Sequence, residues 1–135
     1  MSLKKQILIV GGGFGGVKAA LELEEDSGLE VTLISDKTNF EYHPTLYRTA
    51  TGGRRVISSI SLAEIFEGKN VKIIKGRASK LDSDKKILQT KEGALLHYDY
   101  LVLALGTVTN YFGIKGLDKY SYGIKGLTDA EELKN

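Results

Sequence analysis

Residues 6–16 read Gln-Ile-Leu-Ile-Val-Gly-Gly-Gly-Phe-Gly-Gly, and this stretch decides the fold. Its first half is a short apolar run, rich in β-branched residues, that stops at a cluster of glycines. Such a run is typical of a strand that is buried on both faces. We therefore expect a first strand over residues 6–10, followed by a tight turn.

A helix is expected directly after the glycines. Val17 and Ala20 recur at helical spacing beside charged residues, and Gly28 offers a left-handed stop, so the pattern predicts a helix over residues 14–26. Residues 30–35, Glu-Val-Thr-Leu-Ile-Ser, then form a second β-rich run. Strand, helix and strand follow one another within about 30 residues, which is the size of a right-handed βαβ unit with parallel strands.

Five glycines stand between the first strand and the helix, at Gly11, Gly12, Gly13, Gly15 and Gly16. The first, third and last satisfy the pattern Gly-x-Gly-x-x-Gly, which becomes specific because a buried strand precedes it and a helix follows. A missing Cβ permits the tight turn at Gly11, lets backbone amides approach a pyrophosphate at Gly13, and allows helix and strand to pack closely at Gly16. Since the helix N-terminus then faces the phosphates, the pattern predicts a dinucleotide site.

An acidic residue stands where such a site needs one. Asp36 lies 20 positions after Gly16, at the end of the second predicted strand. A carboxylate there accepts hydrogen bonds from a ribose diol, which a 2′-phosphate would lack, so an unphosphorylated adenosine half is favoured. Two alternatives stay open: Asp36 is an exposed turn carboxylate, or Ser35 holds the end-of-strand position instead.

The chain from residue 36 to residue 55 is irregular and holds the only proline, Pro44. Within it, residues 45–51 favour a short helix that Gly52 and Gly53 close. A loop of this length usually has a function, and a mobile surface loop is the alternative.

The second half of the chain alternates short strands with turns. Ser61 and Glu64 form a capping box before a short helix that ends at Gly68. Residues 100–105, Tyr-Leu-Val-Leu-Ala-Leu, are nearly continuous apolar sequence and suit a central strand covered on both faces. The runs that predict a β-meander with alternating exposure are residues 71–74, 78–81 and 86–89.

Together these elements predict an α/β fold, a Rossmann-like three-layer domain with a parallel central sheet and a β-meander over one face. At 135 residues, one core and one domain are expected. Thr128 and Glu131 make a further capping box, and the helix that they begin stops at Asn135, so we expect a helix that has been cut. The parallel sheet is expected to contain residues 6–10, 30–35, 70–75 and 100–105.

The composition argues against several classes of protein. The net charge of +2 comes from 19 basic and 17 acidic residues spread along the chain, so there is no basic stripe for a nucleic acid. A chain with no cysteine carries no disulfide, Cys-rich metal site or redox dithiol, and no other metal-ligand spacing is present. Residues 7–10 are too short for a signal peptide or a membrane span, and a cytoplasmic location is expected.

At this point the chain resembles the two-dinucleotide-binding-domain flavoproteins, and among them the type II NADH dehydrogenases and the related sulfide:quinone oxidoreductases. The resemblance covers nearly the whole chain. In this family the first FAD/NAD(P)-binding domain holds FAD, and a second glycine fingerprint, absent from this sequence, binds NADH. The stretches that carry the resemblance are Ile-Val-Gly-Gly-Gly-Phe-Gly-Gly at 9–16, Val-Thr-Leu-Ile-Ser-Asp at 31–36, His-Pro-Thr-Leu-Tyr-Arg-Thr-Ala-Thr-Gly at 43–52, Tyr-Asp-Tyr-Leu-Val-Leu-Ala-Leu-Gly-Thr at 98–107 and Asn-Tyr-Phe-Gly-Ile at 110–114.

The resemblance implies a role for each matching residue. The glycine stretch would contact the FAD pyrophosphate, and residues 35–37 the adenosine ribose. Ala78 would meet the adenine through its backbone, Pro44 would border the isoalloxazine ring, and residues 104–106 would close on the cofactor. Leu105 stands where the family usually has a small polar residue. The residues implied to bind FAD are Gly11, Gly12, Gly13, Phe14, Gly15, Gly16, Ser35, Asp36, Lys37, Pro44, Ala78, Ala104, Leu105 and Gly106.

No catalytic residue is assigned. An imidazole such as that of His43 could tune a flavin or relay a proton. A loop histidine without a visible carboxylate partner is, however, more often a packing or surface residue.

The resemblance implies electron transfer from NADH through FAD to a quinone, with residues 1–135 as the N-terminal part of the FAD-binding domain and the NAD-binding domain missing. Three alternatives stay open: a sulfide:quinone oxidoreductase, the NAD-binding domain of a simple dehydrogenase, and a non-enzymatic nucleotide-binding module. The absence of cysteine disfavours disulfide reduction.

The chain by itself is expected to be inactive and to bind FAD weakly or not at all. It is also expected to self-associate through apolar surface that its last helix leaves uncovered. The longer protein is expected to be cytoplasmic or peripheral at the inner face of the membrane.

Overall fold

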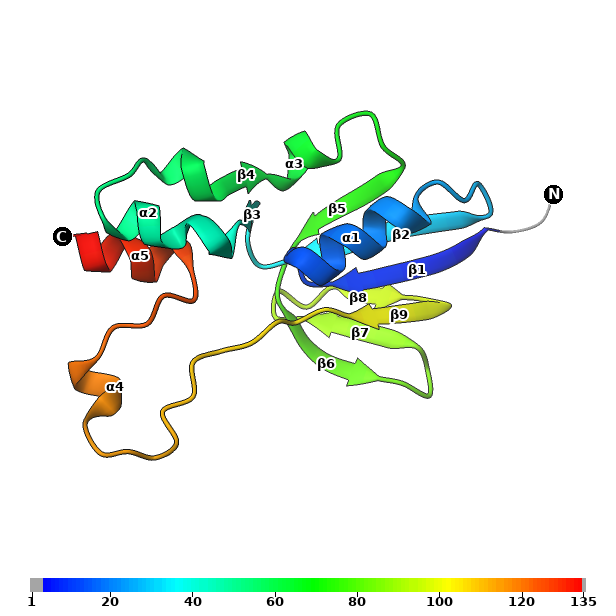
Figure 1. Ribbon diagram of the computed structural model, residues 1–135. Coiled ribbons are helices and arrows are strands. Elements are labelled where there is room, and N and C mark those ends of the chain that lie inside the picture. The colour runs from blue at the N-terminus through cyan, green and yellow to red at the C-terminus, as the bar shows by residue number, and fades with distance from the viewer. Residues whose placement is uncertain (1–3, 135) are drawn as a thin grey trace. The chain divides into compact units, whose positions relative to one another are not determined.

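The apolar run before the glycines forms β1 (Lys5–Val10), an inner strand of a parallel sheet. The computed structural model describes residues 4–134. These divide into two units, one made of residues 4–40 and 61–106 and the other of residues 41–60 and 107–134. Figure 1 traces the elements of both units along the chain.

Four parallel strands make the sheet of the first unit. Their order is β5 (Val71–Lys75), β2 (Leu29–Ser35), β1 and β9 (Tyr100–Leu103). In the register of β1, Ile7 lies opposite Val31 of β2 and Tyr100 of β9. The predicted parallel α/β sheet is therefore confirmed.

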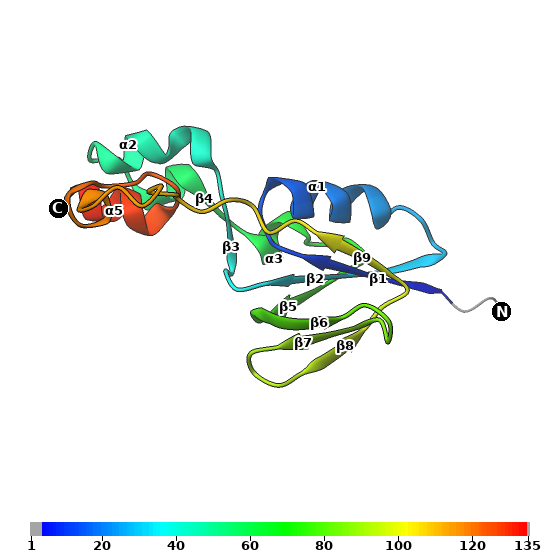
Figure 2. The same cartoon turned by 90° about the horizontal axis from the view of Figure 1, so that it is seen from below.

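Two layers cover this sheet, and Figure 2 shows α1 and the meander on opposite sides of it. On the helical side, Ile9, Leu33 and Ala20 are fully buried. On the meander side, Leu88 packs in a cluster with Leu8 of β1. The covering elements are α1 (Phe14–Leu23), α3 (Leu62–Ile65), β6 (Ala78–Asp82), β7 (Ile87–Thr90) and β8 (Leu95–His97).

Helix α1 is shorter than predicted, because it ends at Leu23 and not at residue 26. The Asp26 carboxylate accepts the N–H of Gly28 at 2.8 Å, and the Asp26 carbonyl accepts the N–H of Leu29 at 3.0 Å. This turn leads directly into β2, and Gly28 does not take the left-handed conformation that we expected.

Two strand expectations need correction. The run at 71–74 was expected both in the parallel sheet, within residues 70–75, and in the meander; it lies in the parallel sheet as β5, so the first expectation is confirmed and the second is wrong. The third strand of the meander is β8, which is too short to show a pattern. Strand β9 is not central: it lies at the edge of the sheet, ends at Leu103, and leaves Tyr100 61% and Leu103 54% exposed. A continuous apolar run does not reveal by itself whether a strand is central or at an edge.

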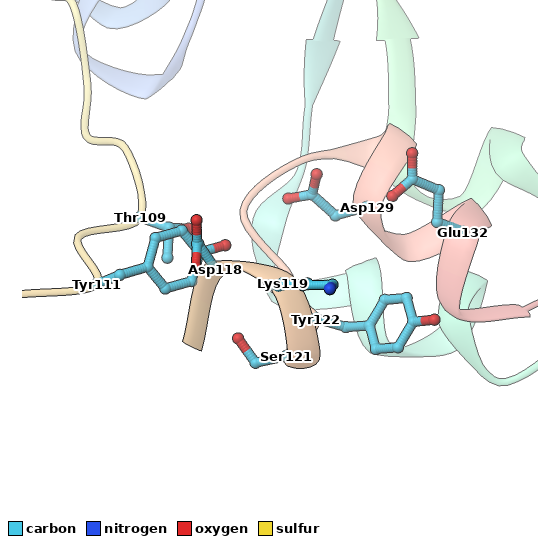
Figure 3. A pocket seen from close by; sticks show the side chains of 9 residues that line it. Thr109, Tyr111, Asp118, Lys119, Ser121, Tyr122, Asp129 and Glu132 are labelled. Carbon is cyan, nitrogen blue, oxygen red and sulfur yellow. The ribbon is translucent and has the colours of Figure 1, made fainter. Parts of the chain in front are cut away.

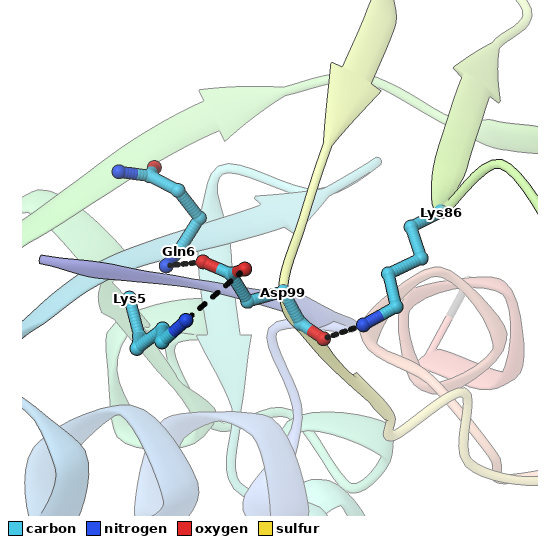
Figure 4. A network of polar contacts seen from close by, with 4 residues as sticks. All are labelled: Lys5, Gln6, Lys86 and Asp99. Atoms are coloured by element: carbon cyan, nitrogen blue, oxygen red, sulfur yellow. Dashed lines mark hydrogen bonds and ion pairs between the residues drawn. The ribbon is translucent and has the colours of Figure 1, made fainter. Parts of the chain in front are cut away.

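Asp99, just before β9, ties three elements of the first unit together (Figure 4). Its carboxylate accepts the backbone N–H of Gln6 at 2.7 Å and lies 3.9 Å from the Lys5 ammonium. Its own backbone N–H donates to the Gln6 carbonyl at 2.8 Å. The Lys86 ammonium, from the turn between β6 and β7, donates to the Asp99 carbonyl at 3.0 Å. Asp99 thus fixes the place where the chain leaves the meander and enters the sheet.

We expect Asp99→Ala to lower the free energy of unfolding by about 1–3 kcal/mol, because the part-buried N–H of Gln6 loses its side-chain acceptor. Urea unfolding followed by circular dichroism measures this loss. The control is Glu30→Ala, which removes an exposed hydrogen bond to the Gln6 side chain and should cost less than about 1 kcal/mol. Equal losses in the two variants would contradict the role given to Asp99.

The second unit is helical, and Leu46, Leu127 and Ala130 form its buried core with Ala50 packed against them. The short helix expected over residues 45–51 is present as α2. Strands β3 (Asn39–Glu41) and β4 (Ser59–Ser61) pair where the chain passes from one unit to the other. The helical elements are η1 (His43–Thr45), α2 (Leu46–Ala50), η2 (Arg55–Ser58), α4 (Leu117–Tyr120) and α5 (Leu127–Lys134).

Both predicted capping boxes differ from the structure. Ser61 holds the N-cap position of α3, but its side chain makes no capping hydrogen bond. Helix α5 begins at Leu127, before Thr128, and the carboxylate of Asp129 accepts the backbone N–H groups of Lys125 and Gly126 at 2.9 and 3.1 Å. The apolar face of this helix is only partly uncovered: Leu127 and Ala130 pack on α2, whereas Leu133 is 37% exposed.

Candidate functional site

The glycine turn leaves the carboxyl end of β1, and its first residue is held from two sides. Gly11 donates its N–H to the Ile34 carbonyl at 2.9 Å and has a φ of +115°. A Cβ at this position would lie 2.1 Å from the carbonyl oxygen of Ala104, which follows β9. Only glycine fits this left-handed, closely packed position.

Two further glycines let α1 approach the sheet. A Cβ at Gly16 would lie 1.8 Å from the Gly11 carbonyl oxygen. One at Gly12 would lie 2.7 Å from Oγ of Ser35 and 2.9 Å from Cδ1 of Leu62. These glycines are therefore required by packing within the first unit, as we expected for Gly16.

Gly13 is different, because the place that its Cβ would take is free of contacts within 4 Å from any described residue other than its neighbours along the chain. Gly13 is the N-cap of α1, in an extended conformation without a side-chain cap, and the first turn of the helix holds no acidic residue. The helix N-terminus carries the positive end of the helix dipole and backbone N–H groups without partners inside the helix. The space in front of Gly13 thus suits a phosphate group.

The helix also begins with an aromatic contact. Phe14 is 47% exposed, and its ring meets that of Phe40 edge to face, with ring centroids 4.9 Å apart. Phe40 was not predictable as a partner of Phe14, because it lies in an irregular stretch with no periodic pattern. Gly15 has ordinary packing, since its Cβ would lie 3.5 Å from that of Ala104.

Ser35 and Asp36, the two candidates for the ribose contact at the end of β2, differ in their exposure. Ser35 is 5% exposed, and its Oγ accepts the N–H of Lys37 at 3.1 Å. Asp36 and Lys37 are exposed. The Asp36 carboxylate is therefore accessible to a ligand, whereas the Ser35 hydroxyl is buried against the glycine turn and already accepts a hydrogen bond.

The segment after β9 borders the same turn. Ala104 donates its N–H to the Val10 carbonyl at 2.8 Å, which places the chain beside the end of β1. Leu105 is 69% exposed, and Gly106 has a φ of +71°. The structure thus brings together the glycine turn, the end of β2 and residues 104–106.

The remaining predicted residues lie elsewhere. Ala78 is the first residue of β6, opposite Thr90 of β7, and packs half-buried in the cluster between sheet and meander. Pro44 and His43 belong to η1 of the second unit. Their roles toward a cofactor stay predictions.

An open cavity of about 330 Å³ lies within the second unit (Figure 3). It places three carboxylates, those of Asp118, Asp129 and Glu132, around a single ammonium, that of Lys119. This charge distribution would repel a phosphate, so the cavity is not a candidate for the dinucleotide. Its lining residues are Thr109, Tyr111, Asp118, Lys119, Ser121, Tyr122, Gly123, Asp129 and Glu132.

Comparison with known proteins identifies the family of this chain. The family model described as pyridine nucleotide-disulphide oxidoreductase matches residues 5–135. The chain belongs to this family.

Among pyridine nucleotide-disulphide oxidoreductases, the sulfide-quinone reductase of Aquifex aeolicus is 33% identical over 124 residues, which are 90% of this chain and 29% of the relative. The solved structure of the Aquifex aeolicus sulfide:quinone oxidoreductase has a TM-score of 0.89 and 32% identity, and the match covers 96% of this chain and 30% of that chain.

A second group of relatives acts on NADH. The type II NADH:quinone oxidoreductase of Mycobacterium tuberculosis is 30% identical over 97% of this chain and 29% of its own length. The structure of Plasmodium falciparum NDH2 in complex with NADH has a TM-score of 0.83 and 30% identity, over 97% of this chain and 28% of that chain. The chain thus spans less than a third of each of these relatives.

Proposed function

We propose that this chain supplies the pyrophosphate and adenosine part of an FAD site in an enzyme that passes electrons from NADH through FAD to a quinone. The observation that carries the proposal is the open space in front of Gly13 at the uncapped N-terminus of α1. The NADH:quinone oxidoreductases among the relatives support the reaction.

The residues of this chain would bind and orient the cofactor. Backbone N–H groups at the start of α1 suit the pyrophosphate, and the exposed Asp36 carboxylate suits the ribose diol. Residues 104–106 border the glycine turn. Ala78 would contact the adenine and Pro44 the isoalloxazine ring, as the resemblance implies. When bound, FAD supplies the hydride and electron chemistry, and the protein supplies its position. The geometry of the site requires no side chain as acid or base.

Sulfide oxidation is the second candidate, favoured by the Aquifex aeolicus sulfide-quinone reductase at 33% identity. The chain contains no cysteine, so any thiol that takes part in such a reaction must come from outside it. Adding NADH or sulfide separately to an FAD-loaded protein, and following bleaching of the flavin absorption, distinguishes the two electron donors.

The quinone acceptor suggests where the enzyme works. No helix within residues 4–134 is long and apolar enough to cross a membrane. Because quinones with long tails dissolve in the bilayer, we propose that the protein meets its acceptor from the cytoplasm, at the inner face of the membrane. Self-association remains part of the proposal, and the exposed edge strand β9 supports it.

We expect FAD to shift the backbone amide NMR signals of residues 11–16 and 36 in the purified chain, and Asp36→Ala to weaken that binding by about 1–3 kcal/mol through loss of a charge-assisted hydrogen bond. A titration with FAD, followed by NMR, measures both effects. The control is Ser35→Ala. If Ser35→Ala weakened binding and Asp36→Ala did not, the ribose role would belong to Ser35, and if no signal of the glycine turn moved, the FAD site would be elsewhere.

A further inference from the structure

Glu41, at the end of β3, reaches a residue that is far away in the sequence. Its Oε2 accepts the backbone N–H of Leu127, the first residue of α5, at 3.0 Å, although the two residues are 86 positions apart. Leu127 is 1% exposed, so water would hardly reach this N–H if the carboxylate were removed.

The same helix start has a second, local cap. The Asp129 carboxylate accepts the N–H groups of Lys125 and Gly126. These two N–H groups precede the helix, whereas the carboxylate of Glu41 accepts the first N–H of α5 itself. The contact from Glu41 therefore caps α5 and also joins the helix to a distant segment.

Residues 43–58, which follow Glu41 in the chain, are closely packed. On one side of α2, Leu46 and Ala50 pack against Leu127 and Ala130 of α5. Elsewhere on the segment, the buried Ser58 hydroxyl lies 3.1 Å from that of Thr49 and 2.9 Å from that of Thr45. Residues 43–58, which include His43 and Pro44, are thus closed on themselves by hydroxyl contacts and held to α5 by apolar packing.

We propose that Glu41 is a positioning residue, whose carboxylate fastens the start of α5 to the end of β3, directly before residues 43–58, so that α5 and that segment respond as one body. A displacement of α5 would then be transmitted to the segment that carries Pro44. The expected effect on the flavin rests on the proposed FAD site. The coupling itself involves only residues of the second unit.

Amide hydrogen exchange of the whole chain tests the coupling. In Glu41→Ala, exchange of the Leu127 amide should rise by at least about tenfold, because a buried N–H loses its acceptor. Exchange in α2 should rise with it, while β1 and β2 of the first unit keep their protection. Glu41→Gln should restore most of the protection, because its side-chain carbonyl can still accept the bond.

A matched control uses an exposed polar contact of α5. Glu131→Gln removes a charge pair with Arg55, at 3.6 Å, whose side chains are 63% and 38% exposed. Such an exposed pair contributes little, so exchange in α2 should stay as in the unmodified chain. If Glu41→Ala fails to fold, Glu41→Asp replaces it, since its side chain is one methylene shorter and loses reach.

The outcome that would overturn the proposal is faster exchange confined to α5, with α2 and residues 43–58 unchanged. A second measurement concerns the cofactor: in protein saturated with FAD, Glu41→Ala should shift the visible absorption band of the flavin and Glu41→Gln should not. Absence of FAD binding in the unmodified chain would count against the FAD site, whereas the exchange experiment would still decide the role of Glu41.

Discussion

One methyl group added at Gly16 is expected to unfold the first unit. The Cβ of Gly16→Ala would lie 1.8 Å from the Gly11 carbonyl oxygen. The oxygen is a main-chain atom, and the position of a Cβ is fixed by the main chain, so no side-chain rotation relieves the clash. The helix would have to move off the sheet, away from the buried contacts of Val17 and Ala20. We expect a loss of at least about 4 kcal/mol, which is a large part of the total stability of a domain of this size.

Urea unfolding followed by circular dichroism measures this loss, and the neighbouring glycine provides the control. In Gly15→Ala the new Cβ would lie 3.5 Å from that of Ala104, an ordinary contact. Since alanine favours a helix over glycine by up to about 1 kcal/mol, this variant should be as stable as the unmodified chain or more so. A stable Gly16→Ala variant would show that helix and strand are not packed as closely as described.

The opposite result is expected at Gly13, where the ligand and not the fold requires glycine. Gly13→Val should fold, because its Cβ would meet no atom of the described residues, and an N-cap change of this kind costs about 1 kcal/mol. Dinucleotide binding should be abolished, since the branched side chain would fill the space in front of the helix N-terminus. An FAD titration combined with urea unfolding separates these two effects.

Gly13→Ala serves as the graded control, because its smaller side chain fills less of the same space. Binding should be weakened less than in Gly13→Val, with stability again nearly unchanged. A folded Gly13→Val variant that binds FAD as tightly as the unmodified chain would rule out the pyrophosphate site at this turn.

The predictable parts of the fold are those that depend on residues close together in the sequence. The apolar run of β1, the glycines and the helical spacing of Val17 and Ala20 lie within a few residues of one another, so their pattern reports local geometry. The end of α1 was not predictable to the residue, because the Asp26 side chain competes with the helix for the backbone of Gly28. The edge position of β9 depends on which strands pair, and an apolar run does not encode pairing.

The same distinction holds for the site. The spacing of the glycines predicted different roles for Gly13 and Gly16, and the structure agrees that packing requires Gly16 while Gly13 faces open space. The close packing of Gly12 against Ser35 and Leu62 was not predictable, because Leu62 is 50 positions away in the sequence. The contact of Glu41 with Leu127 joins residues 86 positions apart, and a glutamate in a loop carries no sign of its partner. Likewise, the burial of Ser35 and the exposure of Asp36 follow from the packing of β2 against the glycine turn.

Because Ala104 packs beside Gly11, the glycine turn is completed late during synthesis of the chain. The turn is complete only after β9 has joined β1, a pairing that the contact between Gln6 and Asp99 spans over 93 positions. On a ribosome the first βαβ segment emerges long before residue 104, with its glycine turn still open on one side. Closing so long a loop is slow compared with forming local structure. A dinucleotide therefore meets the finished turn only late in synthesis.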